Sequence, residues 1–273
     1  MRRREFLAAS TTAAVTLISA KASIGAENSS SRQFFELRTY HFASAQKQQA
    51  YEQFMKDAAV PAFNRAGIEP VGAWKLMAKD NAGNRNMPKT NEGEDPALLY
   101  VLLPHNSFDS VLHVEHKLAA DQEFQKAGAA VLNSPRNDPA YTRFESTLLL
   151  AMEGAPRVTI PSKSSDRVFE LRTYQSRNEE RAANKLEMFN KGEFPLFAAS
   201  GMPGVFFGGA IVGQDLPQLT YMIVHESKEE ASKNWGRFGG NADWKKLTAN
   251  PSYKDNVSKV VNLFVRPTGG SQI

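Results

Sequence analysis

Carboxylate, guanidinium and phenol groups, which together can bind a ligand and move a proton, occur two residues apart in the hexamer FELRTY. The hexamer appears at Phe35–Tyr40 and again at Phe169–Tyr174. Its alternation of apolar and polar residues predicts a strand, on which side chains two residues apart point to the same face. The candidate site therefore consists of the polar set of each copy: Glu36, Arg38, Tyr40, Glu170, Arg172 and Tyr174.

These side chains admit two interpretations, because a buried charge without a partner is strongly destabilising. In the first, each glutamate pairs with an arginine of its own strand or of the other copy, and the network fixes how two sheets pack. In the second, the arginine holds an anionic or enolic ligand, and the tyrosine or glutamate transfers a proton. A cavity on the order of 300 Å³ or more beside Arg38 or Arg172 would favour the second interpretation, whereas a filled interior would favour a scaffold.

Two of the five histidines are weaker candidates. His105 and His225 follow the third predicted strand of each repeat, one residue out of register with each other, and could carry a proton or be ordinary loop residues. His113 and His116 share one face of a predicted helix, but no third ligand accompanies them and the HExxH pattern is absent. An exposed helix face is therefore expected there. We predict no metal site and no cofactor.

The two hexamers begin a longer internal repeat. Prolines and glycines recur at the same offset of 134 residues, and Tyr100 then matches Tyr221 at an offset of 121. The polar stretch Asp80–Pro96 accounts for the change as an insertion and predicts a surface loop, and the stretch Gly154–Arg167 predicts a linker. The predicted organisation is a signal over residues 1–26, a first domain over 32–152, a linker over 153–167 and a second domain over 168–267.

Each repeat predicts the order strand, helix, strand, strand, helix, strand, which is the ferredoxin-like arrangement of an α+β fold. Its helices would cover one face of the sheet and leave the other face bare. Two tandem units can bury these bare faces against each other as one closed barrel with the helices outside. We expect Phe35, Leu37 and Thr39 to face the helices, and the polar residues of the hexamer to face the barrel interior.

Several features recur in order in both units. They are the E-x-R-x-Y strand, a proline and a glycine after the first helix, an aromatic residue late in the second helix, and the turns DPAY and NPSY before the last strand. With these features the chain resembles the NIPSNAP family over about Phe34–Met152 and Val168–Pro267. The resemblance implies the fold of the dimeric α/β-barrel superfamily, here two tandem ferredoxin-like (βαββαβ) units packed sheet to sheet within one chain. In other barrels of that superfamily a histidine at a strand end can bind haem.

The family has no agreed reaction, so the resemblance implies a function only in broad terms. We expect either binding of a small apolar or enolic ligand in the barrel or a scaffold role in the cell envelope. The alternative is a cofactor-independent monooxygenase or isomerase acting on an enolic or aromatic substrate, like other barrels of the superfamily. A small-molecule partner is thus expected, and association into homo-oligomers stays open.

The first residues predict an export signal. The opening MRRREFL fits the twin-arginine pattern R-R-x-F-L, and the uncharged stretch Phe6–Ala20 is too short to span a bilayer. Small residues allow cleavage after Ala22 or Ala26. We therefore expect a periplasmic or otherwise extracytoplasmic protein with no stable membrane insertion once the signal is removed.

Charge and composition exclude several other classes of protein. The whole chain has 33 basic and 29 acidic residues, and residues 1–26 contain four of the basic residues and one of the acidic residues. The remainder therefore has 29 basic and 28 acidic residues, a net charge of +1. A nearly neutral chain does not indicate binding to nucleic acid or to anionic lipid. The absence of cysteine excludes disulfides, thiolate metal sites and a cysteine nucleophile.

Replacing both arginines of the export pattern, Arg3→Lys with Arg4→Lys, should leave the precursor in the cytoplasm, because the export machinery recognises the arginine pair. Cell fractionation followed by immunoblotting measures the distribution. Normal periplasmic accumulation of the double variant would contradict the twin-arginine interpretation.

Overall fold

Eight antiparallel strands close into a barrel in the computed structural model, which describes residues 32–90 and 94–273. Around the barrel the strands follow the order β1-β3-β2-β8-β5-β7-β6-β4. Strands β1 to β4 form one half (unit 1) and β5 to β8 the other (unit 2), each with the strand order of a ferredoxin-like sheet. The predicted α+β fold of two such units is confirmed, while the predicted signal peptide lies outside the described residues.

The elements of unit 1 alternate as predicted. They are β1 (Phe34–His41), α1 (Ala45–Phe54), a π-helical turn (Met55–Ala59), α2 (Val60–Arg65), β2 (Gly72–Leu76), a 3₁₀ turn (Ala78–Asn81), β3 (Leu98–His105), α3 (Phe108–Ala120), α4 (Gln122–Ala127), α5 (Ala129–Leu132) and β4 (Arg143–Ala151).

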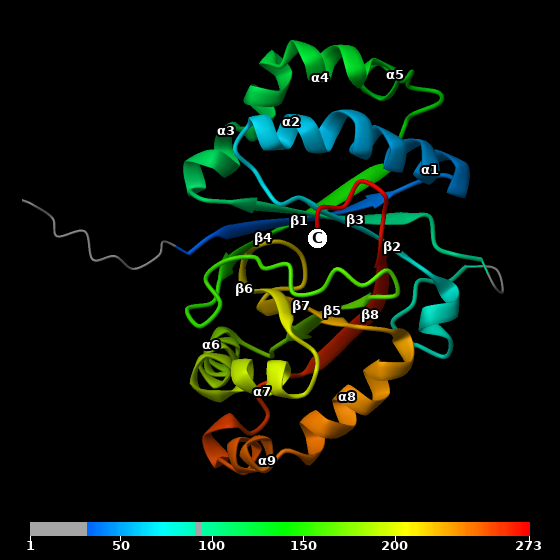
Figure 1. Ribbon diagram of the computed structural model, residues 1–273. Helices are drawn as coiled ribbons and strands as arrows, with labels where there is room; N and C mark the ends of the chain where they lie inside the picture. Colours follow the sequence, from blue (N-terminus) through cyan, green and yellow to red (C-terminus); the bar gives the residue numbers. More distant parts are fainter. Residues whose placement is uncertain (1–31, 91–93) are drawn as a thin grey trace, which may run out of the picture. The chain divides into compact units, whose positions relative to one another are not determined.

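Unit 2 repeats this order. Its elements are β5 (Val168–Gln175), α6 (Glu179–Met188), a π-helical turn (Phe189–Glu193), α7 (Phe194–Ala199), β6 (Gly204–Val212), β7 (Gln218–His225), α8 (Lys228–Gly240), α9 (Ala242–Thr248), a 3₁₀ turn (Pro251–Tyr253) and β8 (Lys259–Pro267). Helices α1 to α5 cover the outer face of one sheet and α6 to α9 that of the other (Figure 1).

The first helix of each unit runs further than predicted. Pro61 and Pro195 do not end these helices but lie just inside α2 and α7, directly after the π-helical turns. In the wider turn of unit 1, the Val60 N–H bonds to the carbonyl of Met55, five residues back. Because this turn already departs from the regular hydrogen-bonding pattern, the chain can accommodate a proline there without ending the helix.

Serine side chains cap the second helix of each unit. The Ser107 side chain accepts a hydrogen bond from the Ser110 N–H at the start of α3, and Ser227 accepts one from the Glu230 N–H at the start of α8. Both serines satisfy a backbone donor that has no partner within its helix. No helix in the described part of the chain is long and apolar enough to cross a membrane.

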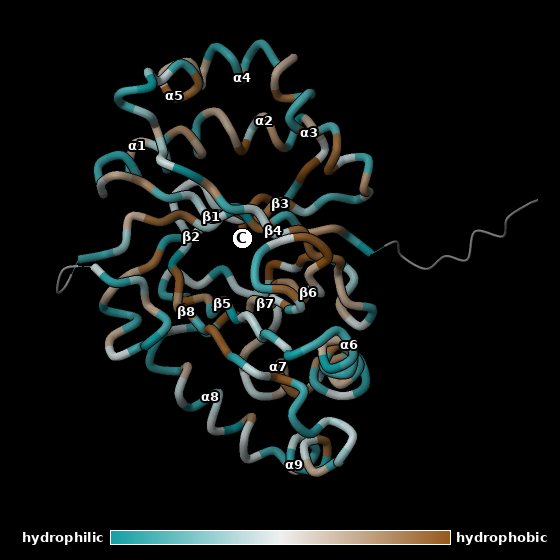
Figure 2. The backbone as a smooth tube through the Cα atoms, turned by 180° about the vertical axis from the view of Figure 1, so that it is seen from behind, coloured by the Kyte–Doolittle hydropathy of each residue, from teal (hydrophilic) through white to brown (hydrophobic). Residues whose placement is uncertain are grey.

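The barrel interior is apolar, and this corrects the predicted orientation of the hexamer. Alternate residues of β1 and β5 point inward and pack with side chains from both sheets. The interior set includes Phe35, Leu37, Trp74, Tyr100, Leu102, Leu149, Phe169, Leu171, Phe206, Met222, Leu263 and Val265. Figure 2 shows hydrophobic stretches along the strands and mostly hydrophilic residues along α6 and α8.

The six polar candidate residues therefore face the helices and not the interior, contrary to the prediction. The physical reason is the cost of burying charge. Side chains from two apolar sheet faces fill the interior, whereas the helix side supplies polar partners, as for Arg38 in unit 1 and Glu170 in unit 2. The residues placed on the helix side are Glu36, Arg38, Tyr40, Glu170, Arg172 and Tyr174.

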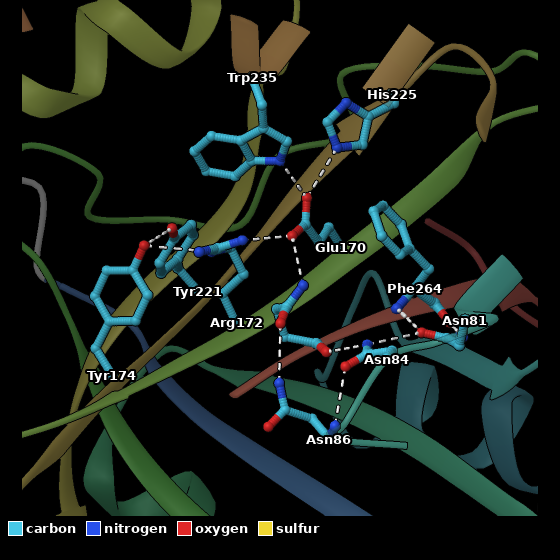
Figure 3. Close-up of polar contacts among 11 residues, drawn as sticks. Asn81, Asn84, Asn86, Glu170, Arg172, Tyr174, Tyr221, His225, Trp235 and Phe264 are labelled. Carbon is cyan, nitrogen blue, oxygen red and sulfur yellow. Dashed lines mark hydrogen bonds and ion pairs between the residues drawn. The ribbon is translucent and has the colours of Figure 1, made fainter. Parts of the chain in front are cut away.

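The insertion in unit 1, predicted as a surface loop, begins with a buried turn that binds unit 2. Strands β2 and β8 pair over only three residue positions. Beyond them, the Asn81 amide donates to the Phe264 carbonyl (2.8 Å) and accepts from the Phe264 N–H (2.9 Å), as a neighbouring strand would (Figure 3). The Asp80 carboxylate binds Arg266 through two hydrogen bonds of 2.7 and 3.1 Å. The insertion thus extends the short contact between β2 and β8, where the two units join.

Strand pairing also corrects the predicted alignment of the third strands. His105 lies opposite Phe34, and His225 lies opposite Val168, which occupies the same position in the repeat. The two histidines are therefore equivalent, at an offset of 120 residues. Tyr100 and Tyr221 are not equivalent: Tyr100 points into the barrel interior, whereas Tyr221 points toward the helices of unit 2.

Unit 1 produced alone, as residues 31–153, should self-associate, because the apolar inner face of its sheet would lose the cover that unit 2 provides. Size-exclusion chromatography with light scattering, with the chain from residue 27 onward as the control, measures this. A folded, monodisperse monomer of the fragment would argue against closure of the barrel within one chain.

Candidate functional site

The Glu36 carboxylate and the Arg38 guanidinium form a bidentate ion pair on β1, beneath the helices of unit 1. The Arg38 Nε and Nη2 atoms donate to the two carboxylate oxygens at 2.7 and 2.9 Å. Ser146 on β4 donates to Glu36 Oε1 (2.8 Å), and Arg38 Nη2 also donates to Glu115 on α3 (2.7 Å). Glu36 and Arg38 are only 8% and 6% exposed. The pairing within one strand confirms one of the two predicted arrangements, and no pairing between the two copies occurs among the described residues.

Both members of this pair are charged at neutral pH. Burial by itself would raise the pKa of Glu36, but His105, Arg38 and Ser146 lower it to about 2. Burial opposes the charge of Arg38 too, yet Tyr40, Glu36 and Glu115 raise its pKa above the usual range. Because the pKa of Glu36 falls on folding, its contribution to stability is present above about pH 4.5 and is lost as the pH falls toward 2.

A cavity of about 740 Å³ lies over the ion pair, between the sheet and the helices of unit 1. Glu36, Arg38, Glu115 and Ser146 form the polar part around the ion pair, and Ser134, Thr142 and Arg143 add polar groups elsewhere in the wall. The rest of its wall is mainly aromatic and aliphatic, and includes Tyr40, Tyr51, Phe54, Met55, Ala59, Phe63, Val114, Leu118, Phe124, Tyr141 and Phe144. This volume falls in the range of pockets that hold small organic ligands.

Three tyrosines meet beside Arg38 in this cavity. The ring of Tyr40 lies 4.9 Å from that of Tyr51 and 5.3 Å from that of Tyr141, and Phe144 stacks on it at 5.1 Å. Burial, reinforced by Tyr40, raises the pKa of both Tyr51 and Tyr141. These two hydroxyls therefore keep their protons and can donate hydrogen bonds to a ligand.

His105 lies behind the ion pair and is completely buried. Its Nδ1 atom is 3.0 Å from the Ser110 hydroxyl on α3. Its Nε2 atom faces Glu36 Oε2 at 3.7 Å, within reach of an ion pair but without a hydrogen-bond partner. The histidine thus supports Glu36 from behind and is not among the residues that line the cavity.

Unit 2 builds the same pair but surrounds it with direct partners (Figure 3). The Glu170 carboxylate accepts hydrogen bonds from Arg172 (2.5 Å), Trp235 (2.7 Å), His225 (3.2 Å) and Asn262 (3.4 Å). Burial would raise the pKa of Glu170, but His225, Arg172 and Trp235 lower it.

The arginine and the tyrosines of unit 2 complete this network. The Trp235 ring covers the Arg172 guanidinium at 4.4 Å. Arg172 also donates to the Tyr174 hydroxyl (3.3 Å), which lies 2.8 Å from the hydroxyl of Tyr221. The charged pair of unit 2 is therefore enclosed by side chains of the protein itself.

Side-chain volume explains why unit 1 is open where unit 2 is filled. At the same positions of the repeat, unit 1 has smaller or differently shaped residues. The pairs, with unit 1 first, are Met55 and Phe189, Ala59 and Glu193, Ala73 and Phe207, Val101 and Tyr221, and Glu115 and Trp235. In unit 2, Phe189, Phe207 and Tyr221 pack as one aromatic cluster with ring centres 5.3 to 5.9 Å apart. This cluster takes the space that a cavity would need.

The sequence analysis identified the polar residues Glu36, Arg38 and Tyr40 of the cavity but not most of the other residues that line it. Glu115 and Tyr51 carried no motif, Tyr141 was noted only as the end of the DPAY turn, and only packing brings the three to Arg38. His113 and His116 are exposed on α3, as predicted. Across residues 32–90 and 94–273, no group of three or more acidic or histidine side chains could hold a metal ion.

Comparisons with known proteins support the fold. A sequence model of the NIPSNAP family matches residues 169–272, which cover most of unit 2, so the chain carries a NIPSNAP domain. No curated protein matches the chain.

Two solved structures are similar over most of this chain. A candidate monooxygenase from Lactobacillus acidophilus NCFM has 12% sequence identity and a TM-score of 0.58, over 87% of this chain and 94% of that chain. A candidate monooxygenase from Fusobacterium nucleatum has 12% identity and a TM-score of 0.54, over 87% and 93%. At such low identity these likenesses concern the fold alone.

The ion pair predicts a measurable coupling. Arg38→Met should destabilise the protein by about 3–5 kcal/mol, because it leaves the Glu36 carboxylate buried without its partner, and adding Glu36→Gln should recover much of that loss. Denaturant unfolding of the two single variants and the double variant gives the coupling energy. Lys191→Met, which removes an exposed ion pair, is the control and should cost less than about 1 kcal/mol. A harmless Arg38→Met with coupling below about 0.5 kcal/mol would contradict a structural role for the pair.

Proposed function

We propose that this chain, whose second unit is a NIPSNAP domain, binds a small, largely apolar aromatic ligand in unit 1, while unit 2 forms the closed half of the barrel. One observation carries the proposal: a cavity of about 740 Å³ contacts Arg38 and is lined mainly by apolar and aromatic side chains. A protein that served only as a scaffold would gain stability by filling this space, as unit 2 does.

The charges around the cavity favour a neutral ligand. Arg38 is already bound by two carboxylates, those of Glu36 and Glu115, so its positive charge is compensated. With Arg143, which also lines the cavity, the wall carries two positive and two negative charges, so an added anion gains no net attraction. Hydroxyl and carbonyl groups suit the site better, because Tyr51 and Tyr141 can donate hydrogen bonds while the aromatic rings pack against the ligand.

Binding is better supported than catalysis. A cofactor-independent monooxygenase or isomerase acting on an enolic or aromatic substrate would use the same cavity and would need a base to remove a proton. Two carboxylates line the cavity. The pKa of Glu36, about 2, makes it a weak base at neutral pH, and Glu115 is paired with Arg38 at 2.7 Å. The raised pKa values of Tyr51 and Tyr141 keep their hydroxyls protonated, so neither supplies a ready base.

Export through the twin-arginine route would place this binding function in the periplasm or another extracytoplasmic compartment. The proposal rests on the sequence MRRREFL and on the apolar stretch that follows it, both outside the described residues. That route carries proteins that are already folded, so the closed barrel would form, and could take up its ligand, before export.

Binding can be measured with naphthalene derivatives that share a ring and differ in charge. The protein should bind 2-naphthol more tightly than 2-naphthoate in a fluorescence titration, because the ionised naphthoate faces the two carboxylates. Ala59→Trp adds a large ring inside the cavity and should weaken naphthol binding roughly tenfold, a change of about 1.4 kcal/mol.

The matched control is Ala199→Trp, which adds the same ring on the exposed side of α7 and should leave binding unchanged. Native mass spectrometry of protein purified from its own host provides a second measurement, because it detects a retained small molecule directly. Equal affinities of the wild-type protein and Ala59→Trp, with no retained molecule, would contradict a ligand site in unit 1.

A further inference from the structure

Helices α3 and α8 occupy the same place in their units, and this makes two very different residues equivalent. Each helix has 13 residues and begins directly after a capping serine, Ser107 or Ser227. Counting from these caps, Glu115 of unit 1 corresponds to Trp235 of unit 2. Both side chains reach the arginine of the hexamer in their own unit.

Trp235 shows how an aromatic group fits over this ion pair. The centre of its ring lies 4.4 Å from the Arg172 guanidinium carbon, and its indole N–H donates to Glu170 Oε2 at 2.7 Å (Figure 3). One planar group thus makes two contacts at once: a cation–π contact with the arginine and a hydrogen bond with the glutamate.

The corresponding place in unit 1 opens into the cavity. The Glu115 side chain is 67% exposed and bonds only to the edge of Arg38, while Glu36 and Arg38 both line the cavity. Within the described residues, the Glu36 carboxylate accepts three hydrogen bonds and the Glu170 carboxylate four. Two of the bonds in unit 2 have no counterpart in unit 1: the one from His225, because His105 Nε2 stays 3.7 Å from Glu36, and the one from Trp235, because Glu115 has no donor. Of these two places, the one that Trp235 fills is the one that opens into the cavity.

We infer that the ligand of unit 1 takes the place that Trp235 fills in unit 2: a planar, electron-rich aromatic molecule with an N–H or O–H donor, stacked on Arg38 and bonded to Glu36 Oε2. This inference rests on the proposed function and narrows its ligand class. An ionised carboxylate can only accept hydrogen bonds, so a donor on the ring is required. An electron-rich ring is required because the guanidinium is attracted to the negative face of the ring.

Two probes that differ by one methyl group test the hydrogen bond. Indole carries the N–H donor and 1-methylindole does not. Wild-type protein should bind indole at least about tenfold more tightly in a calorimetric titration, as expected for a hydrogen bond to a charged acceptor.

A variant tests the location. Glu115→Trp copies unit 2 into unit 1, so the new side chain should occupy the site, abolish indole binding and raise the melting temperature. The control is His116→Trp, which adds the same side chain to the next, exposed position of α3, outside the cavity wall, and should leave indole binding unchanged.

The outcomes separate this inference from the proposed function. Equal affinities for indole and 1-methylindole would overturn the hydrogen bond to Glu36, and unchanged indole binding in Glu115→Trp would overturn the location. Binding of 2-naphthol without any binding of indole would overturn the Trp235 analogy while leaving the cavity a ligand site. If none of the three probes binds to wild-type protein, both the proposed function and this inference are wrong.

Discussion

The buried glutamate–arginine pair on the central strand of each unit is the constraint on which the rest of this structure depends. Such a pair must be surrounded by further polar groups, because two charges leave water at a high cost. The helix side provides these groups, Glu115 in unit 1 and Trp235 in unit 2. With the charges committed to that side, the opposite face of each sheet is apolar, and the two faces together form the interior of one closed barrel.

Duplication of this arrangement allowed the two units to differ without losing the fold. Unit 2 encloses its pair with aromatic rings, and Lys185 and Glu193 add a second buried ion pair where unit 1 has Tyr51 and Ala59. Burial raises the pKa of Glu193 even beside the lysine, so this second pair also depends on its surroundings. Unit 1 lacks this packing and has a cavity instead. An unfilled cavity lowers stability, and such a loss is common at ligand sites.

The sequence predicted correctly that the polar residues of FELRTY alternate with the apolar ones, but it predicted wrongly which face of the sheet they occupy. Alternation in FELRTY shows that Glu36, Arg38 and Tyr40 share a face, but both faces of the sheet are buried, by helices on one side and by the second sheet on the other. Hydropathy along one strand cannot distinguish two buried faces. The match of Tyr100 with Tyr221 failed for a related reason: residue type suggested equivalence, whereas strand pairing places the two rings on opposite faces.

The sequence by itself determined the tandem repeat, the ferredoxin-like element order, the α+β barrel and the polar set of each hexamer, of which Glu36, Arg38 and Tyr40 line the cavity. These follow from local periodicity, turn residues and repetition, which neighbouring residues encode. Tertiary structure alone decided which face the charges take, that the insertion binds β8, and that only one of two identical hexamers lies under a large cavity. The cavity depends on the volumes of side chains such as Ala59, Val101 and Glu115, and the contact with β8 depends on hydrogen bonds of Asp80 and Asn81. In both cases the partners are far apart in sequence and meet only in the folded chain.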